Sequence, residues 1–149
     1  MYVNGDGVEQ DYGKAMEWFQ KAADAGEAAA MFNIGYLYQQ GYGVEQDYGK
    51  ALAWFQKAAD AGIAEAMFNI GVMYMNGYDV EQDDGKAMEW FLKAADAGIA
   101  EAMFNIGVMY MNGYDVEQDY EKAMEWFQKA ADAGYSDAAE IVKQWKDAA

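Results

Sequence analysis

The residues best suited to chemistry in this sequence are the carboxylates of a short acidic segment, Asp79-Val-Glu-Gln-Asp-Asp-Gly. Asp79, Glu81 and Asp83 stand at alternate positions, as the oxygen ligands of a calcium-binding loop do. However, Gly85 comes one position later than such a loop requires, and the twelfth position is Trp90, where a bidentate Glu is expected. A Ca²⁺ site is therefore the weaker interpretation. The alternative is a charged loop in which Asp83 caps a helix.

Few side chains could serve nucleophilic catalysis. The chain contains no His, no Cys and no Thr, and its single Ser, Ser136, is expected to cap a helix. A hydrolase needs both a nucleophile and a base that activates it. The remaining candidates are carboxylates expected in loops and on outer helix faces, where nothing tunes them for acid–base work. We therefore expect no enzymatic activity, no cofactor and no metal site.

The charge of the chain limits its partners. Its 149 residues include 10 basic and 26 acidic side chains, which gives a formal net charge of −16. Nucleic acids and anionic lipids are bound mainly through cations, so we expect neither nucleic acid nor membrane as a partner. A basic or amphipathic protein segment is compatible with this charge, which also serves solubility alone. No apolar run approaches the roughly 20 residues that a membrane-spanning helix needs.

The elements that position these residues repeat with a period of 36 residues. Residues 66–83 and 102–119 are identical, and tryptophan recurs at the same spacing, at Trp18, Trp54, Trp90 and Trp126. We expect one repeat domain over 1–149, with a partial unit at 1–26, full units at 27–62, 63–98 and 99–134, and a capping helix within 135–149.

The second and third full units are nearly identical. They differ at three positions only, Asp84/Tyr120, Gly85/Glu121 and Leu92/Gln128. The first full unit has diverged further. Such similarity is typical of recent duplication or of deliberate consensus design, and both origins stay open.

Each unit contains two helical patterns, shown here for the second full unit. Apolar residues at steps of three and four predict a first helix over about 64–76, which Gly77 ends in a left-handed conformation. Asp83 is then expected to cap a second helix over about 84–97, which Gly98 ends. One such pair cannot bury its own apolar stripe, so it needs a neighbour on each side. The repeat therefore predicts an all-α solenoid of helix pairs.

A glycine in the middle of the first helix has a geometric meaning. Gly71 costs roughly 1 kcal/mol relative to Ala at such a position. We expect that another helix approaches Gly71 closely, with Ala94 and Ala95 as the matching small surface.

The residues of these helices resemble known repeat motifs. Met67-x-x-Ile70-Gly71-x-x-Tyr74 is similar to the W-x2-L-G-x2-Y of tetratricopeptide repeats. The 36-residue period and the longer loop resemble more closely the Sel1-like repeats, whose two motifs are matched over residues 30–47 and 51–62. The resemblance covers nearly the whole chain. It implies a right-handed α-solenoid of antiparallel helix pairs, similar to a tetratricopeptide superhelix, that serves as a protein-interaction scaffold.

One departure from that motif concerns the loop between the two helices. Asp79 and Asp115 stand where the second Gly of G-x-G-V is expected, as at Gly43. If the site requires a positive φ, Asp is among the residues that tolerate it. The departure concerns the detail of this loop and leaves the predicted fold unchanged.

The candidate binding residues lie on the first helix of each unit, which lines the inner, concave side in solenoids of this kind. They point away from the packing stripe, and they mix apolar side chains with amides instead of charges. An apolar face with a polar rim is typical of an interaction site, and Met adapts to varied partners. The positions are Phe32, Asn33, Tyr36, Gln39, Gln40, Glu65, Phe68, Asn69, Val72, Met75, Asn76, Glu101, Phe104, Asn105, Val108, Met111 and Asn112.

Two interpretations of this face stay open. A peptide or an amphipathic helix could lie along it, with the Asn amides holding the backbone of the partner. Alternatively, Phe68 and Phe104 pack between neighbouring first helices of the array. For the valine and methionine positions of the face, we expect exposure and binding.

The tryptophans of the second helices could form a ladder that stacks bases or sugars. Their spacing matches a core position, and the negative charge disfavours nucleic acid. We therefore expect Trp54, Trp90 and Trp126 to pack between units.

The two ends of the array differ. The first complete helix, about residues 11–25, lacks a partner before it, so its Phe19 and Ala22 side is expected to be exposed, either as a fragment of a longer array or as a contact with another copy. The last helix, residues 136–147, carries Glu140, Gln144 and Asp147 where the preceding unit has apolar residues. A polar outer face is what a terminal cap needs.

Two functions remain from different classes. The first is a scaffold that binds a protein or peptide on its concave face. The second is a structural or self-assembling unit without a dedicated ligand, with a homo-oligomer formed through the N-terminal helix or the concave face. The sequence indicates no compartment.

Overall fold

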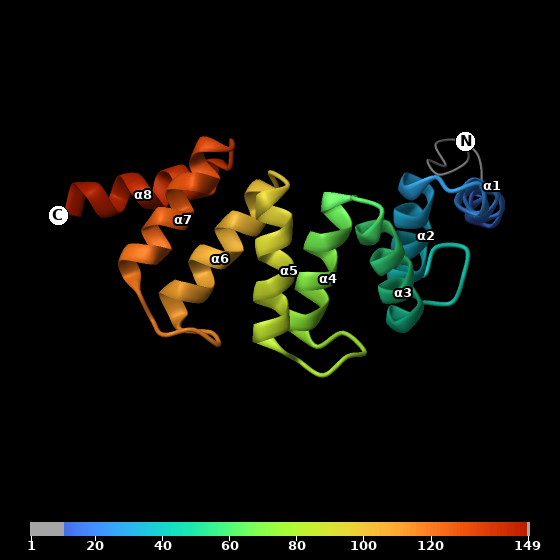
Figure 1. Cartoon of the computed structure of the whole chain (residues 1–149), viewed down its shortest axis with the longest axis horizontal. Helices are drawn as coiled ribbons and strands as arrows, with labels where there is room; N and C mark the ends of the chain where they lie inside the picture. Colours follow the sequence, from blue (N-terminus) through green and yellow to red (C-terminus); the bar gives the residue numbers. More distant parts are fainter. Residues whose placement is uncertain (1–10, 149) are drawn as a thin grey trace.

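The computed structural model describes residues 11–148, which form eight α-helices and no strand. The helices follow one another along the long axis of the molecule, from α1 at one end to α8 at the other (Figure 1). The predicted all-α solenoid of helix pairs is confirmed. The helices are α1 (Tyr12–Asp24), α2 (Ala28–Gln40), α3 (Tyr48–Asp60), α4 (Ala64–Asn76), α5 (Asp84–Asp96), α6 (Ala100–Asn112), α7 (Tyr120–Asp132) and α8 (Ser136–Ala148).

The helices fall into two classes by their place in the unit. We call α2, α4 and α6 the A helices and α3, α5 and α7 the B helices. The most extensive contacts join α2 to α3, α4 to α5 and α6 to α7, so each unit is an A–B pair. By sequence period, α1 is a further B helix and α8 takes an A position. Of the partial unit at 1–26, residues 1–10 lie outside the described residues, as does residue 149 of the terminal segment.

An aspartate caps α1 and every B helix. The Oδ1 atom of Asp83 accepts a hydrogen bond from the backbone N–H of Lys86 at 3.0 Å, which confirms the expected cap. Asp11, Asp47 and Asp119 make the same bond at 2.9–3.0 Å. Each cap satisfies one of the backbone donors that the first helical turn leaves without a partner.

The loop between the A and B helices has the same conformation in each full unit. Gly77 ends α4 with φ 70°, and Asp79 and Asp115 have φ 55° and 58° where Gly43 has φ 74°. The expectation that Asp replaces Gly at a positive φ is confirmed.

Side-chain and backbone hydrogen bonds tie this loop to the end of the A helix. Gln82 Nε2 donates to the carbonyl oxygen of Met75 at 2.8 Å, and the N–H of Asp83 donates to the carbonyl oxygen of Tyr74 at 2.9 Å. The other two loops repeat both bonds. Carbonyl groups at a helix end need such partners. The recurrent Glu-Gln-Asp segment therefore has a structural role, because it supplies hydrogen-bond donors to the end of the A helix.

The core consists of clusters centred on one buried phenylalanine per unit, Phe55, Phe91 and Phe127. Gly71 is buried, and a β-carbon placed on it would lie 2.6 Å from Cε1 of Phe91. The expected close approach is confirmed, but its partner was wrong: the three nearest atoms belong to the ring of Phe91 and not to Ala94 or Ala95.

The tryptophans of the B helices pack between units, as expected. Trp54 packs on the cluster of Ala23, Ala30 and Ile34, which belongs to the preceding helices α1 and α2. Trp90 and Trp126 pack one unit back in the same way. The ammonium group of the lysine three positions later lies 4.1–4.3 Å from each ring centroid, a cation–π contact on the outer side.

The exposed side of α1 differs from the prediction. Phe19 and Ala22 are half-buried against the cluster of Ala23, Ala30 and Ile34, because α2 covers them. The exposed aromatic residue of α1 is Trp18, at 66 %.

The C-terminal helix has the expected polar side. Glu140, Gln144 and Asp147 are all exposed on α8. Ser136 is the first residue of α8, not the cap residue before it, so the predicted cap was placed one position late. None of the eight helices is long and apolar enough to cross a membrane.

Candidate binding surface

All seventeen predicted binding residues lie on the A helices, and none of them is buried. Six are exposed: Tyr36, Gln40, Glu65, Asn76, Glu101 and Asn112. The other eleven are half-buried. The face therefore offers solvent-accessible surface on all three A helices while also contributing to the core.

The phenylalanines of this face are shared between core and surface. The rings of Phe32, Phe68 and Phe104 tilt against those of Phe55, Phe91 and Phe127, with centroids 5.5, 5.8 and 5.3 Å apart. Each ring therefore has a partner on the B helix of the same unit, and Phe104 has a second one in Tyr135, just before α8. Since all three side chains are only half-buried, these positions can still contact a ligand.

The valine and methionine positions are less exposed than expected. Val72 and Met75 are half-buried against the cluster around Phe91, and Val108 and Met111 against the cluster around Phe127. These side chains pack along the contact between the A and B helices, so only part of their surface is accessible to a partner.

The asparagines of the face divide into two groups. Asn76 and Asn112, at the ends of their helices, donate to the carbonyl oxygens of Val72 and Val108 at 3.0 Å. Within residues 11–148, no hydrogen bond engages the side chains of the half-buried Asn33, Asn69 and Asn105. Only the second group keeps its amides available for a partner backbone.

Part of the face is hollowed across three units. One hollow, which we call the inner hollow, has a volume of about 610 Å³. It is lined by Phe32 of α2, Phe68 and Asn69 of α4, and Glu101 of α6. Its remaining lining residues are Glu65, Gly98, Ile99, Ala100, Ala133, Gly134 and Tyr135. The inner hollow thus joins five of the predicted residues and leaves the valine and methionine positions outside it.

The inner hollow is acidic and aromatic. Glu65 and Glu101 are exposed, and none of its lining residues carries a positive charge. The ring of Tyr135 lies 4.9 Å from that of Phe104. Burial raises the pKa of Tyr135 above its ordinary value, and the carboxylates of Asp137 and Glu101 raise it further. The local potential is therefore negative.

Tyr135 was missed by the sequence reasoning, which considered only positions within the A helices. It stands just before α8, where the two preceding units have Ile63 and Ile99. The first unit has Glu27 at this joint. An aromatic residue that occurs there only before the last helix was the available signal.

The acidic loops do not gather metal ligands. Among residues 11–148, no three His, Cys, Asp or Glu side chains form a group that could hold a metal ion. Asp79 Oδ2 lies near Gly49 at the beginning of α3, and Asp83 is committed to its cap. In the described loops, Asp83 therefore has the capping role of the structural interpretation.

Tandem A–B pairs stacked in one row define a helical repeat solenoid. The family model of the Sel1 repeat matches residues 1–27, 28–63, 64–99 and 100–135. The chain therefore belongs to the Sel1 repeat family, whose members generally act as protein-interaction scaffolds. No curated protein sequence matches it significantly.

Solved structures agree with this assignment. A Sel1 repeat protein from Oxalobacter formigenes is 34% identical, with a TM-score of 0.89 over 97% of this chain and 59% of that chain. The protective antigen c5321 of uropathogenic Escherichia coli, which displays an SLR fold, is 38% identical, with a TM-score of 0.85 over 92% of this chain and 29% of that one. The chain thus spans well under two thirds of the length of either. Helicobacter pylori cysteine rich protein B, at 23% identity and a TM-score of 0.67, shares the fold.

Proposed function

We propose that this chain is a non-catalytic scaffold whose inner hollow binds a positively charged segment of another protein. The observation that carries the proposal is the lining of the inner hollow: side chains from three A helices supply two carboxylates and aromatic rings, without a cation among them. The scaffold role general to the Sel1 repeat family supports it.

The chemistry of the inner hollow suits lysine or arginine side chains. A cation is attracted to the face of an aromatic ring, here Phe32, Phe68 or Tyr135, and to the carboxylates of Glu65 and Glu101. The amide of Asn69 is available to hold a partner backbone in an extended conformation. The net charge of −16 would steer such a segment toward the protein.

The experiment compares carboxylates inside the inner hollow with carboxylates outside it. The probe is a fluorescent peptide that alternates Lys and Leu, measured by anisotropy against the full chain. The double substitution Glu65→Gln with Glu101→Gln should weaken binding about tenfold or more, because both carboxylate partners of the cations are removed. The matched control is Glu89→Gln with Glu125→Gln, exposed residues of α5 and α7, which changes the net charge equally.

Equal losses in the two double variants would mean that the peptide responds to overall charge, and the proposal would fail. Binding that persists in both would also contradict it. A version of the peptide with Glu in place of Lys should not bind. Added salt should weaken the complex, because surface charges are screened.

A further inference from the structure

The N-terminal end of the described array carries one half of the contact that joins its internal units. Within the array, the tryptophan of each B helix packs on the cluster formed by the two helices before it, as Trp54 does on the cluster of Ala23, Ala30 and Ile34. Helix α1 is a B helix, and no helix precedes it among residues 11–148. Its Trp18 is accordingly 66 % exposed, whereas Trp54 is half-buried.

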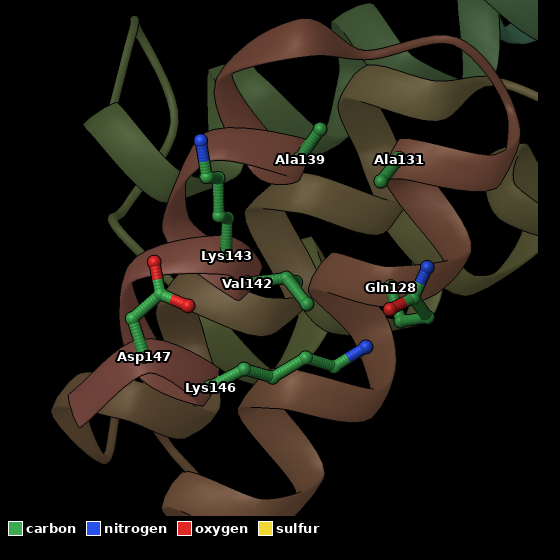
Figure 2. A pocket seen from close by; sticks show the side chains of 7 residues that line it. All are labelled: Gln128, Ala131, Ala139, Val142, Lys143, Lys146 and Asp147. Carbon is green, nitrogen blue, oxygen red and sulfur yellow. The ribbon is translucent and has the colours of Figure 1, made fainter. Parts of the chain in front are cut away.

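The C-terminal end carries the receiving half. A hollow of about 330 Å³, which we call the terminal slot, lies between α7 and α8 (Figure 2). It is lined by Gln128 and Ala131 of α7 and by Ala139, Val142, Lys143, Lys146 and Asp147 of α8.

The terminal slot is equivalent to the surface that receives Trp54. Ala131, Ala139 and Val142 stand three periods after Ala23, Met31 and Ile34, and all three of the latter belong to the Trp54 contact cluster. Burial supports the equivalence. Ala23 and its counterparts in the next two units are buried under a following tryptophan, while Ala131 is partly exposed.

We propose that the chain associates head to tail, with Trp18 of one copy entering the terminal slot of the next. Helix α1 then takes the B position that follows α8, so the alternation of A and B helices continues across the junction. A second copy is the occupant, because this contact is the one that already joins the internal units. Lys146, whose side chain runs toward α7 in Figure 2, adds a cation for the electron-rich face of the incoming indole.

The junction is weaker than an internal one. Lys143 stands where the A helices have Gly35, Gly71 and Gly107, the places against which the B-helix phenylalanine rings pack. Phe19 of an incoming copy is therefore kept out. The polar residues Glu140, Gln144 and Asp147 also stand where Phe104, Val108 and Met111 pack on the cluster around Phe127. Only the tryptophan contact is therefore reproduced. Each copy also carries a net charge of −16, which opposes association until salt screens it. A heterologous contact of this kind builds open chains unless the rotation closes a ring.

Sedimentation velocity of the full chain tests the proposal. The average mass should rise with protein concentration and with added NaCl. Trp18→Lys should abolish the rise, and Ala139→Glu, at an exposed position of α8, should do the same from the other end. Because both positions are exposed, folding is preserved, and circular dichroism checks this. Leu92→Gln is the matched control: it removes an exposed apolar side chain of α5 and should leave the rise unchanged.

Mixing the two variants identifies the geometry. The Trp18→Lys chain keeps its terminal slot and the Ala139→Glu chain keeps its tryptophan, so the mixture should form a one-to-one complex that grows no further. A parent chain that stays monomeric at every concentration overturns the proposal. Association that survives Ala139→Glu alone, as in a Trp18-to-Trp18 contact, also overturns it. So does loss of association through Met75→Lys with Met111→Lys but not through Trp18→Lys.

Discussion

A β-carbon on Gly71 would meet Cε1 of Phe91 at 2.6 Å, and the same contact recurs between Gly35 and Phe55 and between Gly107 and Phe127 at 2.7 Å. Real β-carbons do not approach carbon atoms this closely, and a closely packed core cannot easily absorb the excess volume. The A helix therefore gives up helix propensity at this position so that the phenylalanine of the B helix can pack against its backbone.

Gly71→Ala should destabilise the chain despite its better helix propensity. Overpacking a core costs typically 1–3 kcal/mol, which exceeds the roughly 1 kcal/mol that Ala contributes over Gly in a helix. Denaturation in urea, followed by circular dichroism, measures the change. Gly13→Ala is the control, because Gly13 is exposed in the first turn of α1. Among residues 11–148, a β-carbon there would meet only Asp11 Oδ1, at 3.4 Å. A stability gain in Gly71→Ala would show that the close contact is absent.

Asp83→Ala should also reduce stability, through the start of α5. The Oδ1 atom of Asp83 accepts the N–H of Lys86 at 3.0 Å, and loss of such a cap costs about 1 kcal/mol. Asp83→Asn retains a side-chain oxygen and should recover most of the loss. The comparison of the two variants by thermal unfolding separates the hydrogen bond from the charge, and equal destabilisation in both would contradict the capping role.

The sequence alone was sufficient for the fold because its determinants are local and repeated. Asp83, Gly77 and Gly98 mark helix ends through their own backbone preferences, and the 36-residue period imposes the same solution on every unit. Contacts that depend on orientation were harder. The glycine at position 71 predicted a close helix contact, but the sequence did not identify the contacting residue. Several residues of α5 had a spacing that could place them against Gly71, and only the structure identifies Phe91. Tyr135 lies just before α8, outside the A helices, and it lines the inner hollow together with Ile99, its counterpart one period earlier.

The structure also explains one of the three differences between the nearly identical units. A β-carbon on Gly85 would lie 2.7 Å from Oδ2 of Asp115, which reaches back from the following loop. No loop of the described chain stands in the same relation to Glu121, so a side chain is tolerated there. Nothing in the structure explains why Leu92 corresponds to Gln128.

A second difference predicts a contact that can be restored. Tyr12 stacks on Tyr42 and Tyr48 stacks on Tyr78, with ring centroids 4.7 and 5.0 Å apart, but Asp84 occupies the equivalent place opposite Tyr114. Asp84→Tyr should therefore create a third stacked pair. A double-mutant cycle with Tyr114→Ala should give a coupling energy of about 0.5–1.5 kcal/mol. Tyr36→Ala in place of Tyr114→Ala is the control and should show no coupling with position 84.

Tyr135 predicts how stability responds to alkaline pH. Its pKa is raised in the folded chain from the ordinary 10.0, first by burial and then by Asp137 and Glu101. A group whose pKa is higher in the folded than in the unfolded chain contributes stability that is complete below the unfolded value and is lost as pH rises through the folded value. The unfolding free energy of the parent should therefore fall more steeply above pH 10 than that of Tyr135→Phe.

Glu101→Gln removes one of the causes of the raised pKa of Tyr135, so absorbance titration of the phenols should show a lower pKa for Tyr135 in that variant. Glu89→Gln, at an exposed position of α5, should leave it unchanged, and identical alkaline profiles for parent and Tyr135→Phe would mean that the phenol lies outside the negative potential of the inner hollow.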